Sequence, residues 1–207
     1  GLRAPRACAS MPGGFIEKDA DGREQPCQKW AAEFEEDSGL AVLNNGRYGV
    51  SFEGGEIRLA IARSALFADH YGQRDELMDA LDIGETELDY ALAPFSPAHV
   101  EKTDALAELL GAPPRFVLEG QHDGPMPAVW QGAQIVPETV RVQALKRAEC
   151  GRGYSVRLVE TAGRACRAQI SLPALNASFE AEMRPQEIAT YHIADGLAAK
   201  TDFVEPD

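Results

Sequence analysis

The sequence predicts a mostly β protein with one short helix. Two observations carry this prediction: short runs in which apolar and polar residues alternate, and Gly, Asn and Pro residues that close those runs at near-regular intervals. A third is that a single segment has the apolar period of a helix. With 207 residues, of which 44% are hydrophobic, the chain can bury a core and can hold one large or two small domains.

The first half contains an antiparallel hairpin pattern. The apolar run 40–43 reads as a buried strand that the turn Asn44-Asn45-Gly46 ends. Tyr48, Val50 and Phe52 then alternate with small or polar residues. Gly54-Gly55 supplies a two-residue turn, and apolar alternation returns over a strand at 57–62.

The next segments predict a loop, a strand and the helix. Residues 66–87 are acidic and poor in β-branched side chains, which favours a long surface loop with one helical turn at 75–81. Strand alternation resumes over 88–92 and stops at Pro94. The segment 101–114 has helical spacing, and we expect Leu106, Leu109 and Leu110 on its apolar face.

A Gly- and Pro-rich stretch, 121–132, predicts a linker. Beyond it, alternation returns in short runs that indicate a small β-sandwich, and a polar tail is expected from Asp195. These runs centre on residues 140–144, 154–158, 170–172 and 188–193.

Charge and hydropathy exclude several partners. The 33 Asp and Glu outweigh 20 Lys and Arg, so the net charge of −13 repels nucleic acid and anionic membrane surfaces. No stretch approaches the roughly 18 apolar residues of a spanning helix, and the N-terminus lacks the apolar core of a signal peptide. Because the sequence begins with Gly1 and strand-like residues follow at once, we expect a piece of a longer protein.

The four cysteines do not predict a metal site. Cys8, Cys27, Cys150 and Cys166 lack the C-x-x-C or C-x-x-H spacing of zinc and redox centres. Free thiols in a reducing compartment are expected, which favours the cytoplasm. A Cys150–Cys166 pair remains an alternative if their segments form a hairpin. A homo-oligomer is compatible with the sequence.

Common catalytic motifs are missing from the sequence. There is no P-loop, Gly151-Arg152-Gly153 lacks the third glycine of a dinucleotide site, and Ser38 lacks the glycine of a nucleophile elbow. The histidines are scattered, without H-E-x-x-H or H-x-D, and are expected on loops or on a strand surface: His70, His99, His122 and His192. No motif identifies which two of the acidic residues could form the catalytic carboxylate pair of a glycosidase.

Arg63 is the one candidate ligand-binding residue. It ends the strand expected at 57–62, beside the long acidic loop, where its guanidinium can donate to a ligand hydroxyl or carboxylate. A salt bridge to Asp69 or Glu87 is the alternative. Arg157 and Glu160 lie on opposite faces of another expected strand and indicate only an edge or interdomain charge pair.

At this point the motifs resemble a known family, the C-terminal region of glycoside hydrolase family 38 α-mannosidases. The match runs from about residue 13 to 193, in family order. In the first half, 26–30 resemble P-x-x-x-W, 39–49 resemble G-[LV]-A-[LV]-L-N-[DN] with [KR]-Y-G, 57–64 resemble L-x-L-x-L-L-R-S, and 84–94 resemble G-E-H-E-F-x-Y-A-L-x-P. In the second half, 140–149 resemble N-V-x-x-S-A-L-K-x-A-E, 156–163 resemble [IL]-[IL]-R-L-x-E-x-x-G, and 185–190 resemble P-[FW]-E-I-x-T.

Three positions depart from the family patterns. Thr86 stands where the family has histidine, and Leu88 and Gln186 stand where it has aromatic residues. Any role of that histidine is therefore not carried over.

The resemblance implies an architecture and a parent enzyme. Residues 1–120 would be the C-terminal part of a galactose-mutarotase-like β-supersandwich, 121–132 a linker, 133–194 a small C-terminal β-sandwich and 195–207 a polar tail. The parent would be a retaining, zinc-dependent exo-α-mannosidase that acts on mannose-containing saccharides. Its zinc ligands and catalytic aspartates would lie in an N-terminal catalytic domain, so this chain would hold neither catalytic residues nor metal and would be inactive alone. The family's C-terminal arginine that reaches the sugar corresponds to Arg63.

Two rival functions stay open. A self-standing carbohydrate-binding module needs an exposed aromatic platform, yet Trp30 lies in an apolar setting that favours core packing, which leaves Trp130 as the other tryptophan. A purely structural β-domain needs no ligand site.

Overall fold

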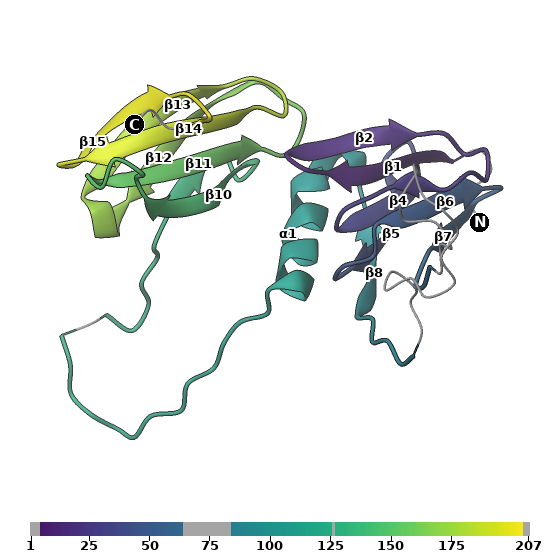
Figure 1. Ribbon diagram of the computed structural model, residues 1–207, viewed down its shortest axis with the longest axis horizontal. Coiled ribbons are helices and arrows are strands. Elements are labelled where there is room, and N and C mark those ends of the chain that lie inside the picture. The colour runs from purple at the N-terminus through teal and green to yellow at the C-terminus, as the bar shows by residue number, and fades with distance from the viewer. Residues whose placement is uncertain (1–4, 64–83, 126, 205–207) are drawn as a thin grey trace, which may run out of the picture. The chain divides into compact units, whose positions relative to one another are not determined.

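The computed structural model describes residues 5–63, 84–125 and 127–204, which form two units of β-sheet (Figure 1). Among the described residues, unit 1 takes those of Gly1–Met11, Ile16–Ala98 and Lys102–Pro113, and unit 2 takes those of Pro12–Phe15, His99–Glu101 and Pro114–Asp207. Strands dominate both, and α1 (Val100–Gly111) is the single α-helix in the described part of the chain. The expected mostly β class with one short helix is confirmed.

Unit 1 consists of two antiparallel sheets. Sheet β2-β1-β4-β5-β8 has five strands and sheet β3-β6-β7 has three. The strands are β1 (Arg6–Met11), β2 (Gly14–Lys18), β3 (Gln25–Pro26), β4 (Trp30–Glu35), β5 (Ser38–Asn44), β6 (Gly49–Glu53), β7 (Glu56–Leu59) and β8 (Tyr90–Phe95).

One face of the five-stranded sheet is an aromatic core. Trp30 on β4 is 1% exposed, and its ring centroid lies 5.6 Å from that of Phe95 on β8. The indole Nε1 donates to Asp104 Oδ1 of α1 at 3.3 Å, which satisfies the polar edge of the buried ring. The expectation that Trp30 packs in the core is confirmed.

The opposite face of this sheet contacts sheet β3-β6-β7. Val50 and Phe52 of β6 are fully buried and form a cluster with Ala9 and Ala31 of β1 and β4. The Gly54-Gly55 turn joins β6 to β7, with Val50 opposite Leu59 and Phe52 opposite Ile57. The predicted hairpin is therefore confirmed.

Three local expectations for unit 1 need correction. Strand β5 alternates, with Ala41 and Leu43 buried but Leu40 45% exposed, because its two faces meet different surroundings. Strand β7 ends at Leu59 instead of 62. Helix α1 buries Thr103 and Ala107, while Leu106 and Leu109 are 45% and 53% exposed.

The helix face was misjudged because small side chains make the contact. Thr103 and Ala107 lie one turn apart and allow close approach of the helix, so burial follows their face and not the leucines. The helical turn expected at 75–81 lies outside the described residues, as does most of the loop expected at 66–87.

Unit 2 is a sandwich of a four-stranded sheet, β10-β11-β14-β15, and a three-stranded sheet, β13-β12-β9. Its core lies between them and includes Leu158, Ile170 and Ile193. The strands are β9 (Gln134–Val136), β10 (Val140–Arg147), β11 (Tyr154–Glu160), β12 (Cys166–Leu172), β13 (Ala177–Met183), β14 (Ile188–Ala194) and β15 (Leu197–Thr201).

One detail of unit 2 departs from the expectation. The stretch expected as a polar tail contains β15, whose Leu197 and Lys200 pair with Ala194 and Tyr191 of β14. Backbone hydrogen bonding to a neighbouring strand, which composition does not report, holds this segment in place. The described part of the expected linker, 121–125 and 127–132, contains neither helix nor strand.

Arg157 and Glu160 do not form the charge pair that their spacing suggested. The Arg157 guanidinium lies 4.0 Å from the centroid of the Phe203 ring and donates to the Phe203 carbonyl at 3.1 Å. Glu160 is fully buried, and its carboxylate accepts the backbone N–H groups of Ala162, Arg164 and Gln186, each at 3.0 Å. These donors replace the water that burial removes, so Glu160 joins two loops of unit 2.

A second carboxylate, Glu187, leads to a prediction on acid stability. Its side chain is 8% exposed and bonds Lys200 Nζ at 2.9 Å and the Arg184 backbone N–H at 2.8 Å. Burial opposes ionisation, but these donors outweigh it and lower the pKa of Glu187 from 4.5 to about 2. A depressed folded-state pKa means that the carboxylate stabilises unit 2 above pH 4.5 and loses this effect as the pH falls towards 2.

Glu187→Gln is therefore expected to lower the free energy of unfolding by about 2 kcal/mol at pH 7, with the deficit shrinking at acid pH. Urea unfolding at pH 7, 5 and 3 measures it. Glu182→Gln, at a side chain that is 85% exposed, is the matched control and is expected to change little. A Glu187→Gln deficit that stayed constant over this pH range would contradict the assignment.

Candidate functional site

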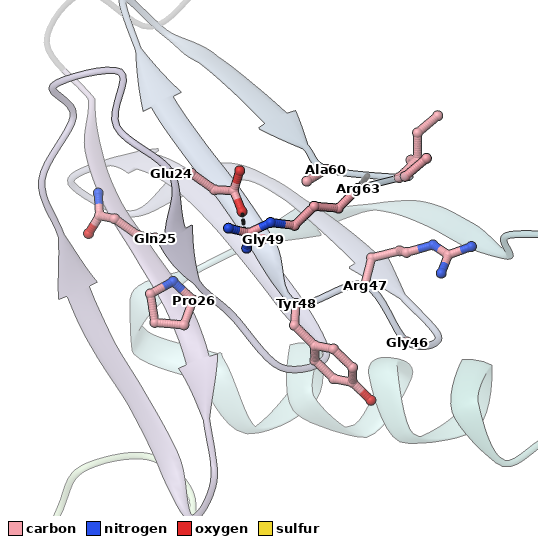
Figure 2. Close-up of a pocket in the computed structure, with 11 residues that line it drawn as sticks. Glu24, Gln25, Pro26, Gly46, Arg47, Tyr48, Gly49, Ala60 and Arg63 are labelled. Atoms are coloured by element: carbon pink, nitrogen blue, oxygen red, sulfur yellow. Dashed lines mark ion pairs between the residues drawn. The ribbon is translucent and has the colours of Figure 1, made fainter. Parts of the chain in front are cut away.

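The candidate site is a hollow of about 460 Å³ in unit 1, beside the turn that joins β5 to β6 (Figure 2). It contains Arg63, the one candidate binding residue from the sequence. Three segments supply its described lining: 24–26, 46–49 and 60–63.

The turn that begins at Asn44 is held by its own side chains. The Asn44 Oδ1 atom accepts the backbone N–H groups of Gly46 at 3.0 Å and Arg47 at 2.6 Å, and Gly46 adopts a φ of 138°. Asn45 Nδ2 donates to the Asp89 carboxylate at 2.8 Å. The Asn-Asn-Gly sequence thus fixes where Arg47 and Tyr48 project.

Gly49 makes room for a carboxylate. A Cβ atom at this position would lie 2.6 Å from Glu24 Oε1, so any larger residue would displace Glu24. The Glu24 carboxylate in turn faces the Arg63 guanidinium, with Oε1 and Nη1 3.8 Å apart (Figure 2). Since the Arg63 side chain is 76% exposed, solvent screens this ion pair, which therefore orients Arg63 weakly.

Arg47 turns to a different partner. Its Nη2 atom donates to Thr86 Oγ1 at 2.5 Å and to the Glu87 carbonyl at 3.3 Å. Thr86 is the residue that replaces the histidine of the family pattern, and here its hydroxyl anchors the arginine. Figure 2 shows the Arg47 guanidinium and the Tyr48 ring directed away from the Arg63–Glu24 pair.

The side chains that line the hollow suit ligand binding. Tyr48 is 65% exposed and presents an aromatic ring, and Arg63 presents charged donors, a combination that suits hydroxyl-rich or anionic ligands. Among the described residues that line the hollow, Glu24 is the single carboxylate. Glycoside hydrolysis needs two carboxylates about the scissile bond, so these residues do not compose that pair.

None of the described histidines or cysteines lines this hollow. His99 contacts the buried Glu101, His122 contacts Glu119 at an exposed position, and His192 Nε2 donates to the Arg152 carbonyl oxygen at 2.7 Å. His70 lies outside the described residues. Burial raises the pKa of Cys8 to about 12 and that of Cys27 to about 11, which keeps both as thiols.

All four cysteines are free, so the alternative Cys150–Cys166 bond does not form. Across the described ranges, no group of three or more His, Cys, Asp or Glu side chains is arranged to hold a metal ion. In the same ranges, no helix combines the length and hydropathy needed to cross a membrane.

Sequence reasoning alone had singled out Arg63 but missed Glu24 and Tyr48. Tyr48 lies in a matched motif and Glu24 lies two residues before one. The available signal was Gly49, which follows Tyr48, because a glycine after a closed turn indicates close approach by another group. The structure pairs Arg63 with Glu24, 39 positions earlier. Asp69, one of the two partners in the salt-bridge alternative, lies outside the described residues.

The fold is mostly antiparallel β-sheet, and unit 1 carries the hollow around Arg63. Residues 1–71 match the family model of the glycosyl hydrolases family 38 C-terminal domain, and the predicted resemblance is confirmed over that part. No curated protein sequence matches the chain.

Two solved structures share the fold. One is an alpha-mannosidase from Enterococcus faecalis V583, with a TM-score of 0.77 and 16% identity over 93% of this chain. The other is a protein of glycosyl hydrolase family 38 from Enterococcus faecalis, with a TM-score of 0.74 and 17% identity over 93% of this chain. The chain spans only 24% and 25% of the lengths of these two proteins.

Proposed function

We propose that this chain is the non-catalytic C-terminal β region of a retaining, zinc-dependent exo-α-mannosidase. The observation that carries the proposal is the match of residues 1–71 to the family 38 C-terminal domain. The shared fold with an alpha-mannosidase over 93% of the chain supports it. Hydrolysis is carried out by the complete enzyme, which acts on terminal α-mannosides.

The partner of this region is an N-terminal catalytic domain of the same polypeptide. The described residues do not fit a zinc site, because they contain no suitable cluster of ligands, so zinc and the catalytic carboxylates are assigned to that domain. The four free cysteines support a reducing location, the cytoplasm.

Within the complete enzyme, Arg63 is the residue that reaches the mannose-containing substrate. A guanidinium offers fixed, always-charged donors to sugar hydroxyls or to an active-site carboxylate, and a lysine does not reproduce that fork. The Arg63 side chain is 76% exposed and lines the hollow, which supports contact with a ligand that enters it.

The test is kinetic. In the complete enzyme, Arg63→Ala and Arg63→Lys are expected to lower kcat/KM by about tenfold or more, roughly 1.4 kcal/mol of transition-state stabilisation, with little change in Tm. Arg58→Ala is the matched control, since Arg58 is an exposed arginine of β7 that pairs with Glu53 and Glu56 at 2.8 Å outside the hollow. A fall in Tm with unchanged kcat/KM would make Arg63 a structural residue.

A further inference from the structure

A second hollow lies in unit 2, at one end of its sandwich. Its volume is about 600 Å³, within the roughly 300–1,000 Å³ of sites that bind small molecules. Three segments line it: 152–154 at the start of β11, 174–176 between β12 and β13, and 193–196 at the turn from β14 to β15. The described lining of this hollow shares no residue with that of the hollow around Arg63.

Tyr154 stands at the end of a row of core residues. It has the same parity on β11 as Val156 and Leu158, which are fully buried, so it belongs to the inner face of the four-stranded sheet. The core ends before it, because Tyr154 is 41% exposed and lines the hollow. The hollow therefore contains an aromatic ring on which an apolar face of a ligand can stack.

The backbone around the hollow is held by close contacts. The Arg152 carbonyl oxygen accepts a hydrogen bond from His192 Nε2 at 2.7 Å. On the opposite side, the Asn176 backbone N–H donates to the Pro173 carbonyl at 3.2 Å. A Cβ at Gly196 would lie 3.0 Å from the Asn176 carbonyl oxygen, so these two turns touch. Such contacts preform the hollow, which lowers the entropy that a ligand must overcome on binding.

The polar side chains of the same segments are left available by the fold. The hollow is lined by four that are exposed: Arg152, Tyr154, Asn176 and Asp195. Within the ranges that the structure describes, no hydrogen bond or ion pair occupies any of these four side chains. They can therefore bind a ligand without breaking a contact of the fold.

This mixture of groups suits a neutral, hydroxyl-rich ligand. Arg152 supplies donors, the Asp195 carboxylate supplies acceptors and the Asn176 amide supplies both, which matches hydroxyl groups that donate and accept. Among the described lining residues, Arg152 and Asp195 are the two charged ones, and their opposite charges favour neither an anion nor a cation. A sugar ring has an apolar C–H face for Tyr154 and hydroxyl groups around its edge.

We propose that this hollow is a second saccharide-binding site, in which a sugar ring packs on Tyr154 and its hydroxyl groups bind Arg152, Asn176 and Asp195. The inference goes beyond the proposed function, which places the sugar contact at Arg63. The choice of a mannose-containing probe rests on that function. The second site retains a saccharide on the enzyme and takes no part in its hydrolysis.

The test is a titration of the 207-residue chain with mannobiose, and in parallel with maltose, followed by backbone amide NMR shifts. The amides of Gly153 and Gly196 report on the hollow in unit 2, whereas those of Gly46 and Gly49 report on the hollow around Arg63. We expect mannobiose to shift the Gly153 and Gly196 amides to saturation, with a Kd in the millimolar range because the hollow is open to solvent.

Two substitutions change the binding groups. Tyr154→Ala removes the ring, and Asp195→Asn, as a second variant, removes the charged acceptor. Asp195 has a φ of 52°, a conformation that asparagine tolerates, so Asp195→Asn keeps the turn. Each is expected to raise the Kd by about tenfold. Asp37→Asn is the matched control, since Asp37 is exposed in the equivalent two-residue turn from β4 to β5, and should leave the Kd unchanged.

The proposal would be overturned if neither disaccharide shifted the Gly153 and Gly196 amides, or if both variants bound as tightly as the unchanged chain. Shifts of these amides by inorganic phosphate and by neither disaccharide would make the hollow an anion site, which also overturns it. Shifts by maltose and not by mannobiose would support the saccharide site and count against a mannose-containing ligand. The titration measures no hydrolysis, so an inactive complete enzyme would refute the proposed function alone.

Discussion

The 207-residue chain on its own is expected to hydrolyse no α-mannoside, with or without added zinc. Retaining glycosidases need two carboxylates about 5 Å apart at the scissile bond, and zinc needs at least three converging ligands. The described residues of this chain contain no metal-ligand cluster, and the hollow around Arg63 has Glu24 as its single described carboxylate. The complete enzyme is expected to hydrolyse α-mannosides, and the isolated chain is expected to show none of this activity.

Release of a chromophore from an aryl α-mannoside measures this, with the complete enzyme as positive control. The non-catalytic assignment would be overturned if the purified chain hydrolysed the substrate and lost this activity when one of its carboxylates was substituted.

Titration of the same sample with mannose and mannobiose addresses the rival function. Binding that disappears in Tyr48→Ala would favour a self-standing carbohydrate-binding module, and no binding leaves the structural β-domain as the rival.

Gly153→Ala is expected to destabilise unit 2 by about 3 kcal/mol. Gly153 precedes β11 with a φ of +75°, and a Cβ there would lie 2.2 Å from the Ile193 carbonyl oxygen on β14. That oxygen is backbone in a paired strand, so it cannot move away as a flexible side chain would. The substitution therefore combines left-handed strain with a forced separation of β11 from β14.

Gly151→Ala is the matched control. Gly151 has a φ of +78°, but nothing lies within 4 Å of a Cβ built on it, so only the conformational cost of about 1 kcal/mol is expected. Urea unfolding with a fluorescence or circular-dichroism readout compares the two. Equal losses would mean that the Ile193 carbonyl does not oppose a side chain at 153, and that backbone strain alone requires both glycines.

The sequence predicted the elements whose burial is periodic. Ile170 and Leu172 of β12 alternate with more polar, less buried residues, and the structure buries both. Val156 and Leu158 of β11 are buried too, although Ser155 and Val159 on its other face are also buried. Alternation has this value because a strand between a core and solvent must send successive side chains to opposite faces. The same reasoning found the hairpin at Gly54-Gly55 and the helix, since turn glycines and helical spacing are local signals.

Periodicity failed where neighbours set the burial. Leu106 and Leu109 looked like the buried face of α1, but Thr103 and Ala107 make the contact. Leu197 to Thr201 looked like a polar tail, but backbone pairing with β14 makes it a strand. For α1 the packing partner lies far along the chain, since Asp104 of the helix bonds Trp30 across 74 positions. Strand β15 pairs with the neighbouring strand β14, but its composition does not report that pairing.

The candidate site divides in the same way. By itself the sequence determined the strand-rich class, the family resemblance and the choice of Arg63, because these depend on short motifs read in order. Only the tertiary structure decided that Glu24 faces Arg63, that Gly49 makes room for Glu24, and that Glu160 accepts three backbone N–H groups instead of pairing with Arg157. Charges and donors act over a few ångströms in space, whereas the chain separates these partners by up to 39 positions, so folding alone brings them together.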